Sequence, residues 1–190
     1  MSRKATKGTK YTLTSVMEQS SAEGNAPQHA KGYIIQLLQT FFTKTNGFGV
    51  PVGSRMEITD ISVVQKVDEP EEREGRVVCE VDVREDMLDV HGNIHGGCIA
   101  YLIDVCTVLP MIAYSQVAPS GWKGGTSLKI DMAFHSTAAL GDRLRVVSRT
   151  LSVGSNFGFA SCEIWNMTSH NLVASGKHMN MEPSKPKTKL

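Results

Sequence analysis

Residues 89–104, DVHGNIHGGCIAYLID, place a polar loop directly before an apolar run. The loop contains two histidines, a Gly-Gly pair follows at positions 96 and 97, and apolar residues then continue to about residue 114. The run is long enough for a helix and apolar on nearly all sides, so we expect a helix that is buried in the protein core. Asp104 interrupts this run. Because a buried carboxylate without a partner is costly, Asp104 should have either a polar partner or a chemical role.

Alternating apolar and polar residues predict six strands around this helix. They lie at residues 55–67 and 76–85 before the helix, and at 126–135, 143–153, 156–166 and 171–181 after it. Ahead of the first strand, apolar residues at helical spacing between positions 34 and 42 predict an amphipathic helix. Since strands and helices do not alternate, we predict an α+β fold, in which an antiparallel sheet wraps a long central helix and an extra N-terminal helix is added.

The composition is that of one globular domain: 190 residues, 41% hydrophobic and 21% charged, with a formal net charge of +1. This charge gives no reason to expect binding to nucleic acid or to an anionic membrane. We expect no membrane span, since no apolar run approaches the required length, and hence a soluble protein. The expected organisation is a disordered or targeting segment at 1–31, one domain at 32–181 and a disordered tail at 182–190.

Three features concern the cellular compartment. The four cysteines include no C-x-x-C pair and no zinc-like spacing, so we expect reduced thiols in an intracellular protein. The basic residues before Glu18 resemble a transit peptide for an organelle, but they also fit a disordered basic tail. The chain ends in Thr-Lys-Leu, one residue away from the peroxisomal signal Ser-Lys-Leu. Mitochondrion, cytoplasm and peroxisome therefore all stay open.

The loop, the apolar run and the next strand together resemble one family. Residues 89–104, followed by GTSLKIDMAFHSTAALGD at 125–142, are similar to hotdog-fold acyl-CoA thioesterases, in particular to the group of PaaI-type enzymes and thioesterase superfamily member 2. The resemblance covers residues 55–181. It implies hydrolysis of acyl-CoA to a free fatty acid and CoA by a homodimer or a dimer of dimers, with no cofactor apart from the CoA of the substrate.

The resemblance assigns catalytic roles to three residues. The carboxylate in the family's helix is a general base or nucleophile, and it corresponds here to Asp104. The backbone N–H that polarises the thioester carbonyl corresponds to Gly96, and the hydroxyl that positions water corresponds to Ser127. Glycines at a helix start leave free N–H groups where the helix dipole favours a developing oxyanion, so elementary chemistry agrees for Gly96. His95, next to the Gly96-Gly97 pair, is expected to hold the loop.

The resemblance also implies a CoA channel lined by residues 134–139 and 152–157. The substrate-binding candidates, besides His95 and Gly97, are Phe134, His135, Ser136, Gly154, Ser155, Asn156 and Phe157. The family often has a basic residue at the position of Ser155, so the phosphates of CoA would be bound less tightly here or by other residues. Lys129, Lys177 and His178 could contact these phosphates, although lysines are more often simply solvated.

Metal binding is not expected. His91 and His95 are four residues apart, but Gly92 and Asn93 lie between them in a loop and no third ligand is near in the sequence. A protein zinc site needs three or four such ligands.

Asp89 stands where the family usually has an asparagine that assists the reaction. An amide can donate to the thioester, whereas an ionised carboxylate can only accept. In one interpretation Asp89 reaches the site and shares a proton with Asp104 of the partner chain, so that it donates in place of the amide. In a second, this coupling leaves a slow enzyme or a non-catalytic acyl-CoA-binding protein. In a third, Asp89 faces solvent and caps its loop, while Asn93 replaces the amide.

The separation of Gly96 and Asp104 along the predicted helix indicates how many chains form one site. Asp104 lies eight residues beyond Gly96, which is about 12 Å along a helix. A base and an oxyanion donor that serve one carbonyl must each lie within roughly 3–4 Å of it or of its water. One chain therefore cannot provide both groups. We expect a two-fold dimer in which antiparallel central helices combine Gly96 of one subunit with Asp104 of the other.

Overall fold

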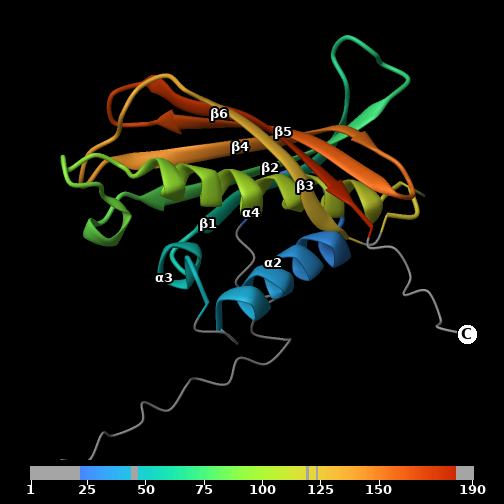
Figure 1. The fold of residues 1–190 in the computed structure, drawn as a ribbon. Helices are drawn as coiled ribbons and strands as arrows, with labels where there is room; N and C mark the ends of the chain where they lie inside the picture. The colour runs from blue at the N-terminus through green and yellow to red at the C-terminus, as the bar shows by residue number, and fades with distance from the viewer. Residues whose placement is uncertain (1–21, 44–46, 119, 123, 183–190) are drawn as a thin grey trace, which may run out of the picture.

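The computed structural model describes residues 22–43, 47–118, 120–122 and 124–182. Six antiparallel strands form one sheet in the order β1-β2-β4-β5-β6-β3. Their bounds are β1 Glu57–Gln65, β2 Arg73–Asp82, β3 Thr126–Phe134, β4 Arg143–Val153, β5 Phe157–Asn166 and β6 Asn171–Met181. The helices are α2 Gln28–Thr43, α3 Val50–Gly53 and α4 Gly96–Ser115, with a short 3₁₀ helix η1 at Glu85–Met87. Figure 1 shows three layers: the sheet, α4 against one of its faces, and α2 with α3 on the far side of α4.

The central helix α4 forms the middle of the core. Leu102, Ile103 and Met111 are completely buried between the sheet and the outer helices, because α4 carries apolar residues on all sides. The helix approaches the sheet closely at Gly75 of β2, where a Cβ atom would clash with the Pro110 carbonyl oxygen of α4. The predicted α+β fold, with a buried central helix and an antiparallel sheet around it, is confirmed.

The same helix corrects one expectation. With 20 residues and few charges, α4 is long enough and apolar enough to cross a bilayer, although the sequence analysis expects no such run. In the fold, 61% of its most apolar window is buried. A core helix and a membrane span share this composition because both exclude charged residues. Its packing against the sheet identifies α4 as a core helix.

The two edges of the sheet differ. Along β1, the segment before α2 covers the edge: Glu23 pairs with Asp60 in a parallel bridge, and the Ala26 N–H donates to the Ile61 carbonyl at 3.1 Å. At the opposite edge, β3 pairs with β6 and with no other strand among the described residues. Leu128 of β3 is 53% exposed. An open edge with exposed apolar side chains is a surface on which another strand can pair.

Packed structure is already present ahead of Gly32, the predicted start of the domain. The expected start, Gly32, lies inside α2, and Ala22 and Ala26 before it are already buried. Lys31 is buried as well, and its Nζ donates to the Ala22 carbonyl at 2.9 Å. Small alanines and a lysine give no apolar periodicity, so the sequence pattern does not reveal that this segment packs against the core.

The predicted limits of the last four strands agree closely with the structure, whereas β2 begins and ends three residues earlier than predicted. β3, β4, β5 and β6 each begin and end within one residue of the predicted limits. Segment 46–53, predicted only as a break, contains the one-turn helix α3. The hypotheses of a transit peptide and of a peroxisomal signal concern residues 1–21 and 183–190, which lie outside the described residues.

Candidate active site

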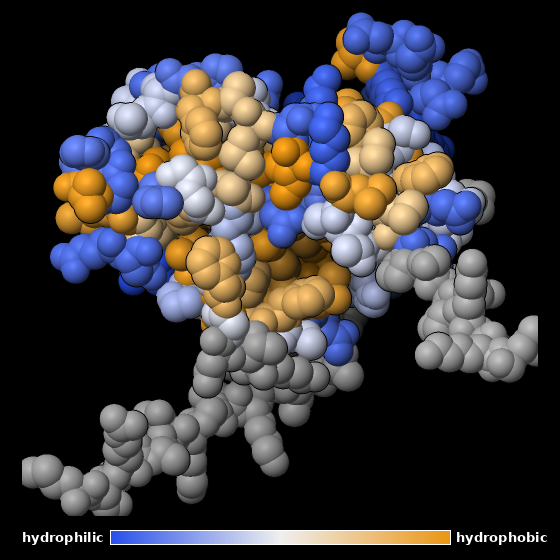
Figure 2. All heavy atoms as spheres, in the orientation of Figure 1, coloured by the Kyte–Doolittle hydropathy of each residue, from blue (hydrophilic) through white to orange (hydrophobic). Residues whose placement is uncertain are grey.

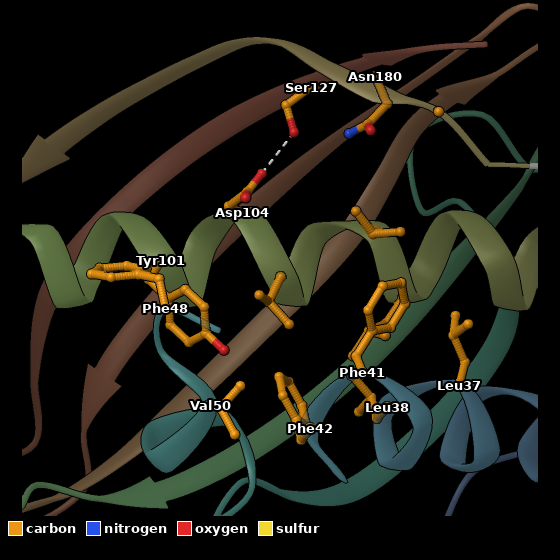
Figure 3. A pocket seen from close by; sticks show the side chains of 14 residues that line it. Leu37, Leu38, Phe41, Phe42, Phe48, Val50, Tyr101, Asp104, Ser127 and Asn180 are labelled. Carbon is orange, nitrogen blue, oxygen red and sulfur yellow. Dashed lines mark hydrogen bonds between the residues drawn. The ribbon is translucent and has the colours of Figure 1, made fainter. Parts of the chain in front are cut away.

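Asp104 lies on α4 at the polar end of a cavity. The Ser127 hydroxyl donates to Asp104 Oδ1 at 2.8 Å, and His178 Nε2 lies 3.4 Å from the same oxygen. Figure 3 shows Asp104 pointing from α4 toward Ser127, with Asn180 beside them. The Asp104 side chain is 44% exposed, so the expectation of a buried carboxylate was wrong for the single chain. The apolar run is buried, but Asp104 faces the cavity between α4 and the open-edged strand β3, where solvent reaches it.

His178 supports this cluster from inside the sheet. Its ring is completely buried, Nδ1 lies 2.6 Å from the Thr107 hydroxyl, and Nε2 lies 2.9 Å from the Asn180 amide nitrogen. Burial lowers the pKa of His178, and the negative charge of Asp104 offsets part of this effect. The Thr107 hydroxyl also donates to the Ile103 carbonyl at 2.7 Å. Because a hydroxyl has one hydrogen, it accepts from Nδ1–H of a neutral imidazole, which leaves Nε2 to accept from Asn180.

This position of His178 corrects the idea that it contacts CoA phosphates. A completely buried, neutral ring cannot reach a solvated phosphate. The sequence-based predictions gave no indication that His178 lies beside Asp104, and they did not point to Asn180 at all. A signal was available, because His178 and Asn180 are two residues apart on a strand and therefore share its inward face. Two polar residues on a buried face need partners, and such a pair indicates a polar cluster.

The start of α4 provides a second, separate polar group. His95 is the N-cap residue of the helix, and its Nδ1 accepts from the Gly97 N–H at 2.8 Å. Its carbonyl accepts from the N–H groups of the next turn, those of Cys98 and Ile99. Among the described residues, the Gly96 N–H has no hydrogen-bond partner. The expected holding role of His95 therefore has a physical basis, and Gly96 keeps a free donor at the positive end of the helix dipole.

Asp89 is tied into its own loop. Its Oδ1 accepts from the backbone N–H groups of His91 at 2.8 Å and Asn93 at 3.0 Å. These two hydrogen bonds lower the pKa of Asp89. Two donors stabilise the ionised form of Asp89 and so argue against a proton held on this carboxylate. The structure agrees with the interpretation in which Asp89 caps the loop.

The first group of substrate-binding candidates lies near the start of α4. Phe134, at the end of β3, is 57% exposed, and its ring lies 3.4 Å from where a Cβ of Gly96 would be. His135 Nε2 lies 2.9 Å from the Ser175 hydroxyl. The Ser136 hydroxyl donates to the Leu172 carbonyl at 2.7 Å. The structure thus brings Phe134 to Gly96, whereas Ser136 is engaged by β6.

The second group lies at the other end of α4. Residues 154–157 form the turn between β4 and β5, in which the Gly154 N–H donates to the Phe157 carbonyl at 2.9 Å. Ser155 and Asn156 occupy the turn, and the next residue, Gly158, packs against the Met111 side chain of α4. Met111 lies fifteen residues beyond Gly96, about 22 Å along the helix. One chain therefore does not bring the two groups of candidates together.

An apolar cavity of about 320 Å³ extends from Asp104 toward α2. Its lining consists of Leu37, Leu38, Phe41, Phe42, Phe48, Val50, Tyr101, Asp104, Val105, Val108, Leu109, Gly125, Ser127 and Asn180. Figure 2 shows hydrophobic residues around a hollow on the face that α2, α3 and α4 form.

Among the described residues, no group of three His, Cys, Asp or Glu side chains could hold a metal ion.

Comparison with known proteins gives consistent relatives. The model of the thioesterase superfamily matches residues 91–172. Acyl-coenzyme A thioesterase 13 of Homo sapiens is 29% identical over 104 residues, which are 55% of this chain and 71% of that protein. A candidate esterase of Schizosaccharomyces pombe is 30% identical over 139 residues, 72% of this chain and 75% of that protein.

Solved structures agree with these relatives. The crystal structure of zebra fish thioesterase superfamily member 2 has 24% sequence identity and a TM-score of 0.61, and the match covers 78% of this chain and 94% of that one. The hotdog fold and the family that the sequence implied are thereby confirmed. The chain belongs to the thioesterase superfamily, as an acyl-coenzyme A thioesterase 13-like hotdog protein and a thioester hydrolase by class.

Proposed function

We propose that the protein hydrolyses acyl-CoA thioesters to a free carboxylic acid and CoA. The observation that carries this proposal is the carboxylate of Asp104, which Ser127 contacts at 2.8 Å at the polar end of an apolar cavity. A thioester of CoA has this same division, with an apolar acyl chain on one side of a reactive carbonyl. Asp104 can receive the carbonyl, while the cavity receives the chain.

The chemistry needs one base and one oxyanion donor. Asp104 removes a proton from water as the water attacks the thioester carbon, or the carboxylate itself attacks and water then cleaves the resulting anhydride. The C–S bond breaks, CoA leaves as a thiolate and takes up a proton, and the acyl group becomes a carboxylic acid. The Gly96 N–H stabilises the oxyanion of the tetrahedral intermediate. Ser127 orients the carboxylate and its water.

The two groups come from different chains in this proposal. Within one chain Gly96 lies about 12 Å from Asp104 along α4, too far to serve one carbonyl. The open β3 edge and the exposed side chains of Leu128 and Phe134 support pairing of two chains about a two-fold axis. The mass in solution should then correspond to two or four chains of 20.7 kDa. A fully active monomer would contradict this assembly.

The test is the release of free CoA from a series of acyl-CoA substrates, measured with a thiol reagent. We expect many turnovers per chain. Binding of acyl-CoA without CoA release would instead support the alternative of a non-catalytic or slow acyl-CoA-binding protein. That alternative rested on charge coupling between Asp89 and Asp104 of the partner chain, whereas the hydrogen bonds of Asp89 within its own loop support a capping role for Asp89.

A further inference from the structure

We propose that α2 and residues 47–50 form the wall of the acyl-binding pocket, and that the volume of this pocket limits the acyl chain to about twelve carbons. The proposal rests on the proposed function, since it identifies which acyl-CoA the site accepts. The matched family region at 91–172 includes neither α2 nor residues 47–50. The match to the zebra fish structure covers 78% of this chain and extends beyond that region. The acyl specificity would therefore depend on which side chains stand on α2 and at residues 47–50, and not on the presence of these segments.

The occupant follows from the chemistry of the cavity lining. Asp104 is the only charged residue among the lining residues, and it lies at one end with Ser127 and Asn180. The body of the cavity is lined by leucine, valine, phenylalanine and tyrosine. Burial raises the pKa of Tyr101 to about 12, so this side chain is neutral as well. The phosphates of CoA find no cation there, whereas an acyl chain attached to a carbonyl at Asp104 enters an apolar space.

The wall is held in place by packing at both ends. Leu38 of α2 is buried in the hydrophobic core, and Phe42 of α2 packs against Gly53 of α3. On the other side of the cavity, the rings of Phe48 and Tyr101 meet edge to face with centroids 5.8 Å apart. Figure 3 shows these side chains along the side of the cavity that lies opposite Ser127 and Asn180.

A left-handed glycine makes the contact with Tyr101 possible. Gly49 has φ of 73°, and its Cα lies so close to the Tyr101 ring that a Cβ would clash with it. The same backbone conformation turns the chain into α3 and brings Val50 to the cavity. Phe48 is 86% exposed even though its ring contacts Tyr101. An exposed aromatic side chain at the cavity suits the role of covering an apolar ligand.

The volume of the cavity sets the length of the chain. An apolar protein cavity of about 150 Å³ accommodates benzene, so each of the six carbon atoms takes up about 25 Å³ of cavity volume. The cavity of about 320 Å³ then accommodates about twelve carbons by the same ratio. Val108 lies one helical turn beyond Asp104 and therefore on the same face of α4. A larger side chain at this position would occupy the path of the acyl chain directly beyond the carboxylate.

The test compares acetyl-, hexanoyl-, decanoyl- and hexadecanoyl-CoA as substrates. We expect kcat/KM to rise by up to about fourfold per methylene group, the equivalent of about 0.8 kcal/mol, until about twelve carbons and then to level off. Val108→Phe should lower kcat/KM for decanoyl-CoA at least about tenfold and leave acetyl-CoA within about twofold. Equal loss for all four substrates, or a rise that continues to hexadecanoyl-CoA, would overturn the proposal.

A second pair of variants keeps the test independent of how well Val108→Phe folds. Phe41 and Tyr33 are both aromatic residues of α2, 59% and 47% exposed, but only Phe41 lines the cavity. Phe41→Ala should weaken the use of decanoyl-CoA about fivefold and spare acetyl-CoA, while Tyr33→Ala changes neither. If both variants behave alike, α2 does not contact the acyl chain.

Binding measured without turnover separates this proposal from the proposed function. In an Asp104→Asn background, decanoyl-CoA should bind more tightly than acetyl-CoA, and Val108→Phe should abolish the difference. Chain-length selectivity in binding without CoA release by the natural protein would contradict hydrolysis but support the pocket. CoA release with no chain-length selectivity would contradict the pocket alone. If Val108→Phe changes the oligomeric mass and affects all substrates equally, the cavity wall is a subunit contact, and the proposal is overturned.

Discussion

The beginning and the middle of α4 present two different polar groups to solvent. At the beginning, His95 caps the helix and, among the described residues, the Gly96 N–H has no hydrogen-bond partner. No carboxylate is hydrogen-bonded to this end of the helix among the described residues. In the middle, Asp104 has Ser127 and His178 as neighbours, but backbone N–H groups inside a helix are bonded to the preceding turn and cannot stabilise an oxyanion. Each region lacks what the other supplies. A hydrolytic site that uses both requires two chains, and the following predictions test each half of this division.

The largest effect is expected at Asp104. Asp104→Asn should lower kcat by about 10³-fold or more, because the amide can still accept from Ser127 but cannot take a proton from water. Asp131→Asn is the matched control, since this carboxylate lies on the same strand as Ser127, is 61% exposed and pairs with Lys129. Steady-state CoA release measures both. Asp104→Asn activity within a few-fold of the natural protein would show that the middle of α4 holds no base.

The next largest effect is expected at Gly96. Proline is tolerated at the first position of a helix and has no N–H, and His95 has the extended ψ of 135° that a following proline requires. Gly96→Pro should therefore keep the fold and lower kcat by about 10²-fold to 10³-fold. Gly96→Ala, whose Cβ would make an ordinary contact with Phe134, keeps the N–H and should stay within a few-fold. Equal activity of the two variants would exclude the Gly96 N–H as the oxyanion donor.

Ser127→Ala should lower kcat about tenfold, because it removes one hydrogen bond to a charged group. Thr126→Ala is the control, since neighbouring residues of a strand point to opposite faces. The measurement is again steady-state CoA release. An unchanged rate in Ser127→Ala would mean that Asp104 needs no orienting hydroxyl.

The two regions should also differ in their response to pH. The pKa of His178 is lowered in the folded protein and returns to its ordinary value of 6.5 on unfolding. Below that pH the unfolded chain binds more protons, so the free energy of unfolding is largest above about 6.5 and falls as the pH decreases. Urea unfolding at pH 7.5 and 5.5 measures this slope. His178→Gln should flatten it, whereas the exposed His91→Gln should not; equal slopes would contradict a buried neutral His178.

The smallest effect is expected at Asp89. An asparagine oxygen can accept the same two backbone N–H groups as the carboxylate, so Asp89→Asn should keep kcat/KM within about twofold. The acidic limb of the pH–rate profile should stay where it is, because the backbone N–H groups of Asn93 and His91 lower the pKa of Asp89 and favour its ionised form. A displaced acidic limb in this variant would restore the interpretation of a proton shared with Asp104.

Local patterns in the sequence predict most of the fold. α4 is apolar on nearly all sides and the strands alternate with period two, and both patterns arise from contacts with one common core. What the pattern misses depends on backbone rather than on apolar side chains. The segment before α2 covers the β1 edge through backbone hydrogen bonds and buried alanines, and the one-turn helix α3 depends on the left-handed Gly49.

The site is predictable only in part, for a similar reason. Asp104, Ser127 and Gly96 carry recognisable chemistry at recognisable spacings, whereas His178 and Asn180 join Asp104 through strand pairing across more than seventy residues of sequence. For Asp89, the comparison with a family position suggested a catalytic role. The local sequence DVHGN, with a left-handed glycine at position 92, instead indicates a turn in which an aspartate accepts from the backbone that follows.

The most direct test of the two-chain site is complementation between two inactive variants. Gly96→Pro and Asp104→Asn chains are co-expressed, and CoA release is compared with each variant alone and with the natural protein. In randomly formed dimers half of the molecules are mixed, and each has one intact site of two, so activity should return to about a quarter of the natural level. If mixed dimers are present by mass spectrometry and activity stays at the level of the single variants, Gly96 and Asp104 do not meet across the interface.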